Sequence, residues 1–294
     1  MSAARDAARA RVRGAPRRAG APKPSTRLRW PGGESGEGRD TIPRPEVVPI
    51  GGLPIARLSG GQVVDHVFDS LRRGLGGWLV TANVDFVQRS QSRPEIRALY
   101  EQADLVVADG APLIWASALA GARVPERVAG SDLVWSLAER AAAEGRSLYL
   151  LGGQGDAGER AALRLRARWP ELHIAGVSSP SLSLPPTEEE LAPVVEDAVR
   201  AAPDIVYSAL GSPKQEFVIR ALRAELPHSW MMGCGISLSF VAGDIPRAPV
   251  WMQRSGLEWV HRLCLEPRRL ASRYLLHNLP FTLRLLYQSL RAEA

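Results

Sequence analysis

From Val47 onward, short runs of apolar and β-branched residues alternate with longer segments of helical period, and the junctions carry Gly, Pro, Asp or Ser. Such alternation predicts an α/β fold with one Rossmann-like, mostly parallel sheet and helices on both faces. We expect strands at Val47–Ile50, Trp78–Ala82, Leu105–Ala108, Ser147–Leu151, His173–Val177, Ile205–Leu210 and Trp230–Cys234.

Segments of helical period fill the gaps between these strands. We expect helices near Gln62–Arg73, Val84–Gln102 with a break at Pro94, Pro112–Ala120, Asp132–Glu144, Ala157–Arg168, Glu188–Ala201 and Pro213–Glu225. After Gly243 the alternation stops, and residues 245–294, rich in Arg, Trp and Leu, are expected to form a separate helical appendage. Residues 45–244 would then form the Rossmann-like catalytic domain.

The net charge of +6 is unevenly distributed along the chain. Residues 1–44 contain 11 Arg and Lys against 4 Asp and Glu, and residues 245–294 contain 8 Arg against 3 Glu. These segments carry +7 and +5, so the total of +6 leaves −6 for residues 45–244. Basic ends suit an anionic partner such as nucleic acid, an acidic membrane surface or a diphosphate. We expect residues 1–44 to be disordered, because their Ala, Arg, Pro and Gly bury little surface.

No run of the sequence approaches the roughly 18 apolar residues that span a bilayer, and no apolar stretch follows the early arginines to make a signal peptide. We therefore expect a cytoplasmic protein. Cys234 and Cys264 lie in apolar contexts without metal-ligand spacing, which predicts two reduced core cysteines. The five histidines are scattered and no Asp-x-Asp motif occurs, so we expect no metal site.

Ligands of doubly wound sheets bind beyond the carboxyl ends of the strands. The candidate site residues at these positions are Thr81, Asn83, Asp109, Gly152, Gly153, Gly211, Lys214 and Gln215. Asp109 belongs to an Asp-Gly pair, which is an ordinary turn or a source of a carboxylate that acts as general base. Thr81 and Asn83 are substrate hydrogen-bonding groups or simple turn and N-cap residues.

A G-x-G-x-x-G pattern runs from Gly153 to Gly158, between a strand and a helix, where backbone amides can hold a diphosphate. A dinucleotide site also needs an acidic residue at the end of the next strand, which here ends in Val177-Ser178-Ser179. The pattern therefore disfavours an NAD-type oxidoreductase. A tight turn without a ligand explains it as well as phosphate binding does.

The segment from Gly211 to Glu216 also has two interpretations. Ser212 as N-cap, Pro213 at the first helical position and Gln215 in a capping box would explain it as a helix start. Lys214, however, is one of two lysines in a chain with 35 arginines, which is a mild indication of function. Nucleic-acid binding is another function class that the basic ends allow. It is disfavoured because the body is acidic and no strand alternates aromatic and basic residues.

Several motifs follow one another in a specific order: Thr81-Ala82-Asn83, Ala108-Asp109-Gly110, Arg127 to Asp132, Leu150 to Gly153, Gly211 to Glu216, Arg247-Ala248-Pro249, Leu257-Glu258-Trp259 and Glu266 to Leu270. From about Pro49 to about Leu279 this ordered set resembles the WecG/TagA/CpsF family of bacterial glycosyltransferases. The joint order is specific, although no single motif is.

The resemblance implies an inverting, metal-independent transferase without a cofactor. Its UDP-sugar donor would supply N-acetylmannosamine or a related hexose to an undecaprenyl-diphosphate-linked saccharide, for teichoic acid, enterobacterial common antigen or exopolysaccharide. It implies Asp109 as the catalytic base, Thr81 and Asn83 as a polar pair on the acceptor side, and Gln215 as a pocket glutamine.

The resemblance also implies that Arg262 and Arg269 of the appendage close over the diphosphate. Gly130 and Asp132 are further substrate-binding candidates of the same motif set. The basic appendage suits peripheral contact with the inner face of the cell membrane, or a packed helical hairpin with a solvated basic face. A homo-oligomer is compatible with the sequence, which specifies neither the donor sugar nor the acceptor.

Overall fold

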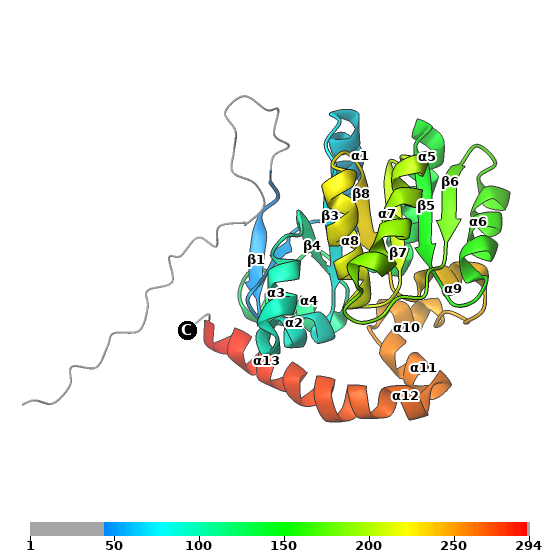
Figure 1. Cartoon of the computed structure of the whole chain (residues 1–294). Helices are drawn as coiled ribbons and strands as arrows, with labels where there is room; N and C mark the ends of the chain where they lie inside the picture. Colours follow the sequence, from blue (N-terminus) through cyan, green and yellow to red (C-terminus); the bar gives the residue numbers. More distant parts are fainter. Residues whose placement is uncertain (1–43, 293–294) are drawn as a thin grey trace, which may run out of the picture.

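The computed structural model describes residues 44–292, which form a six-stranded sheet, a separate two-stranded hairpin and helices on both faces of the sheet (Figure 1). All six strands are parallel, in the order β4-β3-β8-β7-β5-β6. They are β3 (Gly77–Ala82), β4 (Leu105–Ala108), β5 (Ser147–Gly152), β6 (His173–Ser178), β7 (Ile205–Ala209) and β8 (Trp230–Gly233). The predicted α/β class is confirmed. The predicted disordered tail lies outside the described residues except for Arg44.

Helices cover both faces of the sheet, which explains why every residue of β3, β4, β5 and β8 is buried. The helices on one face are α2 (Val84–Ser92), α3 (Pro94–Tyr100), α4 (Ala111–Leu119), α7 (Glu188–Ala201) and α8 (Lys214–Glu225). Those on the other face are α1 (Gly60–Arg72), α5 (Gly130–Glu144), α6 (Ala157–Arg168) and α9 (Ser237–Ala242). Of these, α9 was not predicted from the sequence.

The first predicted strand does not join the main sheet. Instead, β1 (Val47–Ile50) pairs antiparallel with β2 (Leu53–Ala56), a strand that the sequence analysis missed. Gly51 and Gly52 connect them with φ angles of 58° and 90°. Two glycines with positive φ form the tight loop of a hairpin, because a side chain there would be strained. The Gly-Gly pair was therefore the signal that could have corrected the prediction.

The ends of β3 and β4 are level at the carboxyl edge of the sheet. Ala82 lies opposite Ala108 in the parallel register, and the amide of Asp109 donates to the carbonyl of Ala82 at 2.7 Å. Asn83 and Asp109 therefore leave the sheet next to each other. This edge is where the candidate site lies.

Residues 245–292 form a helical segment, as predicted, that runs along the carboxyl edge of the sheet (orange and red in Figure 1). We call these residues the C-terminal segment. Its helices are α10 (Val250–Arg254), α11 (Glu258–Leu265), α12 (Pro267–Ala271), the π-helical turn η1 (Ser272–Asn278) and α13 (Leu279–Ala292). Within residues 44–292, no helix combines the length and apolar character needed to cross a bilayer.

The C-terminal segment packs into the main hydrophobic core. Leu285 of α13 is 2% exposed and lies in one cluster with residues of the hairpin, β3 and α2. Phe281 and Leu286 pack against the same cluster, and α13 lies along α4. A segment that contributes a fully buried leucine stabilises the α/β body as well as covering its edge.

Candidate functional site

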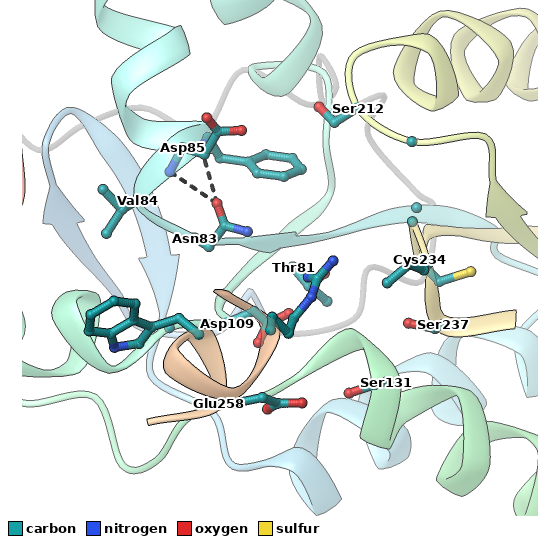
Figure 2. A pocket seen from close by; sticks show the side chains of 18 of the residues that line it. Thr81, Asn83, Val84, Asp85, Asp109, Ser131, Ser212, Cys234, Ser237 and Glu258 are labelled. Atoms are coloured by element: carbon teal, nitrogen blue, oxygen red, sulfur yellow. Dashed lines mark hydrogen bonds between the residues drawn. The ribbon is translucent and has the colours of Figure 1, made fainter. Parts of the chain in front are cut away.

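A cavity of about 760 Å³ lies at the carboxyl edge of the sheet, with the C-terminal segment along one side. The predicted site residues that line it are Thr81, Asn83, Asp109, Gly153, Gly211, Lys214, Gln215 and Arg262; Figure 2 shows part of this lining. Gly130, Asp132 and Gly152 are not among the described residues that line the cavity. Arg269 belongs to α12, but its side chain lies outside the described part of the structure.

Asp109 directly follows β4, and its side chain is 24% exposed. Its Oδ2 accepts a hydrogen bond from the Gly130 amide at 3.2 Å, and its Oδ1 lies 3.6 Å from Nη1 of Arg127. Removal from bulk water raises the pKa of Asp109 from 3.8 to about 7, against smaller opposing effects of Arg127 and of the Gly130 amide. A carboxyl group with a pKa near 7 can take up a proton at physiological pH, as a general base must.

Thr81 and Asn83 lie on either side of the end of β3. The Oδ1 of Asn83 accepts from the amides of Asp85 at 3.0 Å and Phe86 at 3.4 Å, so Asn83 is the N-cap of α2. It also lines the cavity, so the N-cap interpretation and the site interpretation hold together. A Cβ added to Gly130 would lie 3.0 Å from Oγ1 of Thr81, so the glycine allows α5 to begin against this strand.

Gln215 lies in the first turn of α8 and is 3% exposed. Its Nε2 donates to Oε1 of Glu216 at 3.0 Å, and its Oε1 accepts from the Gly235 amide at 3.2 Å. A Cβ added to Gly233 would lie 2.3 Å from Nε2 of Gln215. Gly233 at the end of β8 and Gly235 just after it therefore hold this amide group against the cavity.

Of the two interpretations of Gly211 to Glu216, the capping box at the start of α8 does not form. The helix begins at Lys214 with Pro213 at the N-cap and no side-chain cap. Ser212 instead accepts a hydrogen bond at Oγ from Arg89 at 3.1 Å and lies 3.3 Å from the hydroxyl of Tyr100. The local sequence around Ser212 does not indicate these contacts, because Arg89 and Tyr100 belong to helices far away along the chain.

Five charged residues that line the cavity were not among the predicted site residues: Asp85, Arg89, Arg127, Glu258 and Arg273. Arg89 donates to the Ser212 carbonyl at 3.0 Å and pairs with Asp85, one turn earlier on α2. Arg273 of η1 pairs with the same carboxylate at 2.6 Å, which ties the C-terminal segment to α2. The i, i+4 spacing of Asp85 and Arg89 was the available signal. Arg262, which was predicted, also lines the cavity.

The glycine-rich turn after β5 is a packing feature and a cavity wall. A Cβ on Gly152 would lie 2.8 Å from the carbonyl carbon of Ala209, so Gly152 lets β5 and β7 lie close together. Gly153 has a φ of 105° and lines the cavity. Lys214 lines it too, and its amine donates to the carbonyl of Leu182 in the loop before α7.

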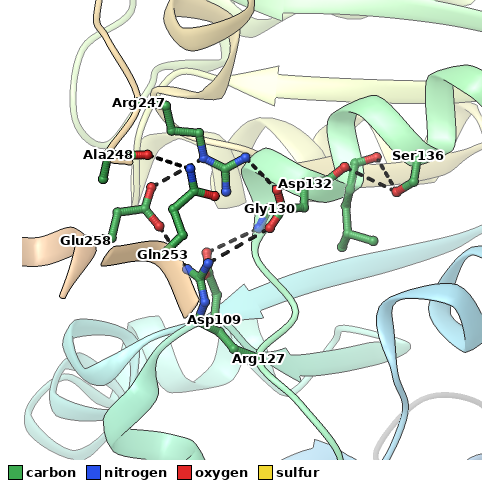
Figure 3. A network of polar contacts seen from close by, with 10 residues as sticks. Asp109, Arg127, Gly130, Asp132, Ser136, Arg247, Ala248, Gln253 and Glu258 are labelled. Atoms are coloured by element: carbon green, nitrogen blue, oxygen red, sulfur yellow. Dashed lines mark hydrogen bonds and ion pairs between the residues drawn. The ribbon is translucent and has the colours of Figure 1, made fainter. Parts of the chain in front are cut away.

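A network of four charged residues joins Asp109 to the C-terminal segment (Figure 3). Nη1 of Arg127 lies 3.0 Å from Oε2 of Glu258, closer than the 3.6 Å to Asp109. Arg247 contacts Oε1 of Glu258 at 3.5 Å and donates to Asp132. Asp132 therefore contributes to the site through Arg247 and, at 3.9 Å, through Arg127, without lining the cavity.

Cys234 is buried beside the cavity, and burial raises the pKa of its thiol to about 12. Cys264 is exposed, so the prediction that both cysteines belong to the core is wrong for this one. Helical periodicity did not reveal that this side of α11 faces away from the body. Among residues 44–292, no three His, Cys, Asp or Glu side chains lie together as a metal site would require.

The cavity thus combines a carboxyl group whose pKa is raised to about 7, four amide side chains and several guanidinium groups. Carboxylates accept protons from hydroxyl groups, and guanidinium groups form bidentate hydrogen bonds with phosphates. Such a set suits the attack of a hydroxyl group on a phosphorylated substrate.

Two matches with known proteins cover most of this chain. Residues 48–294 match a family model described as the Glycosyl transferase WecG/TagA/CpsF family. An N-acetylglucosaminyldiphosphoundecaprenol N-acetyl-beta-D-mannosaminyltransferase of Bacillus spizizenii (strain W23) is 30% identical over 222 residues, which are 75% of this chain and 84% of the relative. The family match covers both the α/β body and the C-terminal segment.

Proposed function

The chain belongs to the WecG/TagA/CpsF family of glycosyltransferases, and from this we propose a specific reaction for it. It transfers a hexose, N-acetylmannosamine or a related sugar, from a UDP-sugar to an undecaprenyl-diphosphate-linked saccharide. The activity of the Bacillus relative supports this acceptor and this sugar, because the name of that protein describes such a transfer. The product would serve synthesis of a cell-surface polysaccharide.

Asp109 carries the proposal, because it lies in the cavity with a pKa raised to about 7. In the reaction, an Oδ atom of Asp109 takes the proton of the acceptor hydroxyl as its oxygen attacks the anomeric carbon. The bond from that carbon to the diphosphate oxygen breaks, and UDP leaves on the opposite side. One displacement of this kind inverts the configuration at the anomeric carbon.

The leaving UDP gains negative charge, which arginines of the cavity would stabilise. Arg89, Arg262 and Arg273 line the cavity, and their guanidinium groups form strong hydrogen bonds with phosphate oxygens. We propose that they, together with Arg269, neutralise the diphosphate without a metal ion or another cofactor. Thr81, Asn83 and Gln215 would orient the sugar hydroxyl groups from the opposite wall.

Peripheral binding to the membrane would bring the cavity to its lipid-linked acceptor. Exposed apolar side chains repeat at helical spacing along η1 and α13: Leu276, Leu279, Leu283, Tyr287 and Leu290. Leu285, on the other side of α13, faces the core, so this exposed stripe remains on the outside. An apolar stripe near exposed Arg284 and Arg291 suits an anionic lipid surface.

A panel of UDP-sugars, offered with a synthetic polyprenyl-diphosphate-linked saccharide, tests the reaction. We expect turnover of at least one donor, with release of UDP and an inverted glycosidic bond seen by NMR. The Asp109→Asn variant should lose about two to four orders of magnitude in turnover while binding UDP as the wild type does. Turnover within threefold of wild type would exclude Asp109 as the base.

The membrane contact has a separate test with vesicles of anionic phospholipid. The wild type should sediment with the vesicles, and a Leu276→Glu, Leu283→Glu variant should stay in the supernatant. The double variant should still turn over a water-soluble acceptor. Equal sedimentation of both proteins would show that this stripe does not bind the membrane.

A further inference from the structure

Arg127 contacts three carboxylates: Glu258 of the C-terminal segment, and Asp109 and Asp132 of the α/β body, with Asp132 the most distant at 3.9 Å from Nη2. The same nitrogen, Nη1, lies 3.0 Å from Oε2 of Glu258 and 3.6 Å from Oδ1 of Asp109. Glu258 belongs to the first turn of α11, 131 residues further along the chain. The guanidinium is therefore held mainly by the C-terminal segment, although Arg127 itself lies in the loop between α4 and α5 of the α/β body.

All three side chains are largely sheltered from solvent. Their exposed fractions are 21% for Arg127, 17% for Glu258 and 24% for Asp109. In sheltered surroundings an ion pair is screened little, so a shift of the guanidinium between the two carboxylates changes the basicity of each. A full pair with Asp109 would make that carboxylate a weaker base.

We infer that Glu258 is a positioning residue for the general base: by binding the guanidinium of Arg127, it prevents a full ion pair between Arg127 and Asp109. This inference rests on the proposed role of Asp109. Glu258 reaches the network because the C-terminal segment covers the cavity. The contact that keeps Arg127 from Asp109 therefore depends on the C-terminal segment lying over the cavity.

The charged groups around this pair support the assignment. Asp109 faces Arg127, Glu258 and Asp132, and the two carboxylates oppose the effect of Arg127 on its pKa. Arg247, from the stretch before α10, holds the other oxygen of Glu258 at 3.5 Å and also contacts Asp132. Glu258 is therefore fixed from two sides, as a group that positions another should be.

The test is a titration of Asp109 in the full-length protein, followed through the carboxyl carbon of ¹³C-labelled aspartate and assigned with Asp109→Asn. In Glu258→Gln, Arg127 turns to Asp109 and a nearby negative charge is lost. We expect the midpoint to fall by about half a pH unit or more. Where turnover is measured, the rising limb of kcat/KM against pH should shift in the same direction, and kcat should fall about tenfold or more.

Two variants separate positioning from a structural role. Glu258→Asp keeps the negative charge, so the Asp109 midpoint should fall less than it does in Glu258→Gln. Glu139→Gln, on the exposed side of α5, makes the same chemical change away from the cavity and should leave the Asp109 titration unchanged. In an Arg127→Met background, Glu258→Gln should lose most of its effect on kcat, because Glu258 acts through Arg127.

The result that overturns the inference is a folded Glu258→Gln protein, by circular dichroism, whose Asp109 titrates as in the wild type. Additive effects of Glu258→Gln and Arg127→Met would overturn it as well. If Glu258→Gln does not fold, the titration of Asp109 in Glu258→Asp and in Arg127→Met decides. In Arg127→Met the midpoint of Asp109 should rise. The titration needs no substrate, so failure of every UDP-sugar would count against the proposed function and leave this result standing.

Discussion

Replacing Asp109 by Asn should make the protein more stable above neutral pH, while it removes activity. In the folded protein the pKa of Asp109 is about 7, against 3.8 for the ordinary side chain. The folded state therefore binds the proton more tightly than the unfolded chain does. As the pH rises from about 4 to about 7, the unfolded chain ionises first, and the free energy of unfolding of the wild type falls.

The size of this effect follows from the two pKa values. A difference of about three pKa units lowers the free energy of unfolding of the wild type by about 4 kcal/mol above pH 7. About 2.5 kcal/mol of this loss develops between pH 5 and pH 8. Because the cavity is open to water, the measured loss of stability should be smaller than this value. The direction and the pH window of the loss stay the same. Asn is nearly isosteric and keeps an oxygen for the Gly130 amide, so the variant lacks the ionisation and little else.

Urea denaturation of the two proteins at a series of pH values measures the effect. The free energy of unfolding of Asp109→Asn minus that of the wild type should increase from pH 5 to pH 8 and then level off. Asp65→Asn, at a side chain that is 61% exposed, is the matched control for the same change on the surface. A difference that stays constant over this range, beyond the control, would refute the raised pKa and the argument built on it.

Three further predictions concern the metal, the core and the pocket glutamine. Turnover should survive EDTA, because arginines are proposed to hold the diphosphate; loss of activity that Mn²⁺ or Mg²⁺ restores would contradict this. Leu285→Ala should lower the free energy of unfolding by about 2–5 kcal/mol in urea denaturation, since the side chain is 2% exposed. A change below about 1 kcal/mol would mean that α13 is loosely attached. Gly233→Ala should displace Gln215, whose Nε2 lies 2.3 Å from the new Cβ position, and lower turnover up to about a hundredfold with little loss of thermal stability. Unchanged kcat/KM would remove Gln215 from the site.

The sequence predicted the main sheet well, because buried parallel strands and amphipathic helices leave strong local patterns. β4 has the predicted bounds, Leu105–Ala108, and α6 has the predicted bounds, Ala157–Arg168. The hairpin was missed because its second strand, Leu53–Ala56, is short and follows the first after two residues. Short strand pairs contain too few residues to show a periodic pattern, so the glycines of the connecting turn are the better indicator of a hairpin.

Thr81, Asn83, Asp109 and Gln215 were expected near one another because they lie close to the carboxyl ends of parallel strands, which share one edge of the sheet. All four line the same cavity. What no local pattern contains is the charge network. Arg127 and Glu258 are 131 residues apart, and their contact depends on how the C-terminal segment folds back over the sheet. The pKa of Asp109 likewise depends on burial, which exists in the folded chain alone.

The division of the chain into two domains at residue 245 also remains a prediction. The contacts of the C-terminal segment decide which variants can test the role of this segment. The segment supplies Leu285 to the core, Arg273 to the Asp85 carboxylate and Glu258 to the network around Asp109. A truncation would remove all three at once. Loss of activity in such a protein could not distinguish a missing guanidinium from a loosened core. Single substitutions that leave Leu285 in place are therefore the informative experiments, because they change the charge at the cavity while α13 still holds the segment against the body.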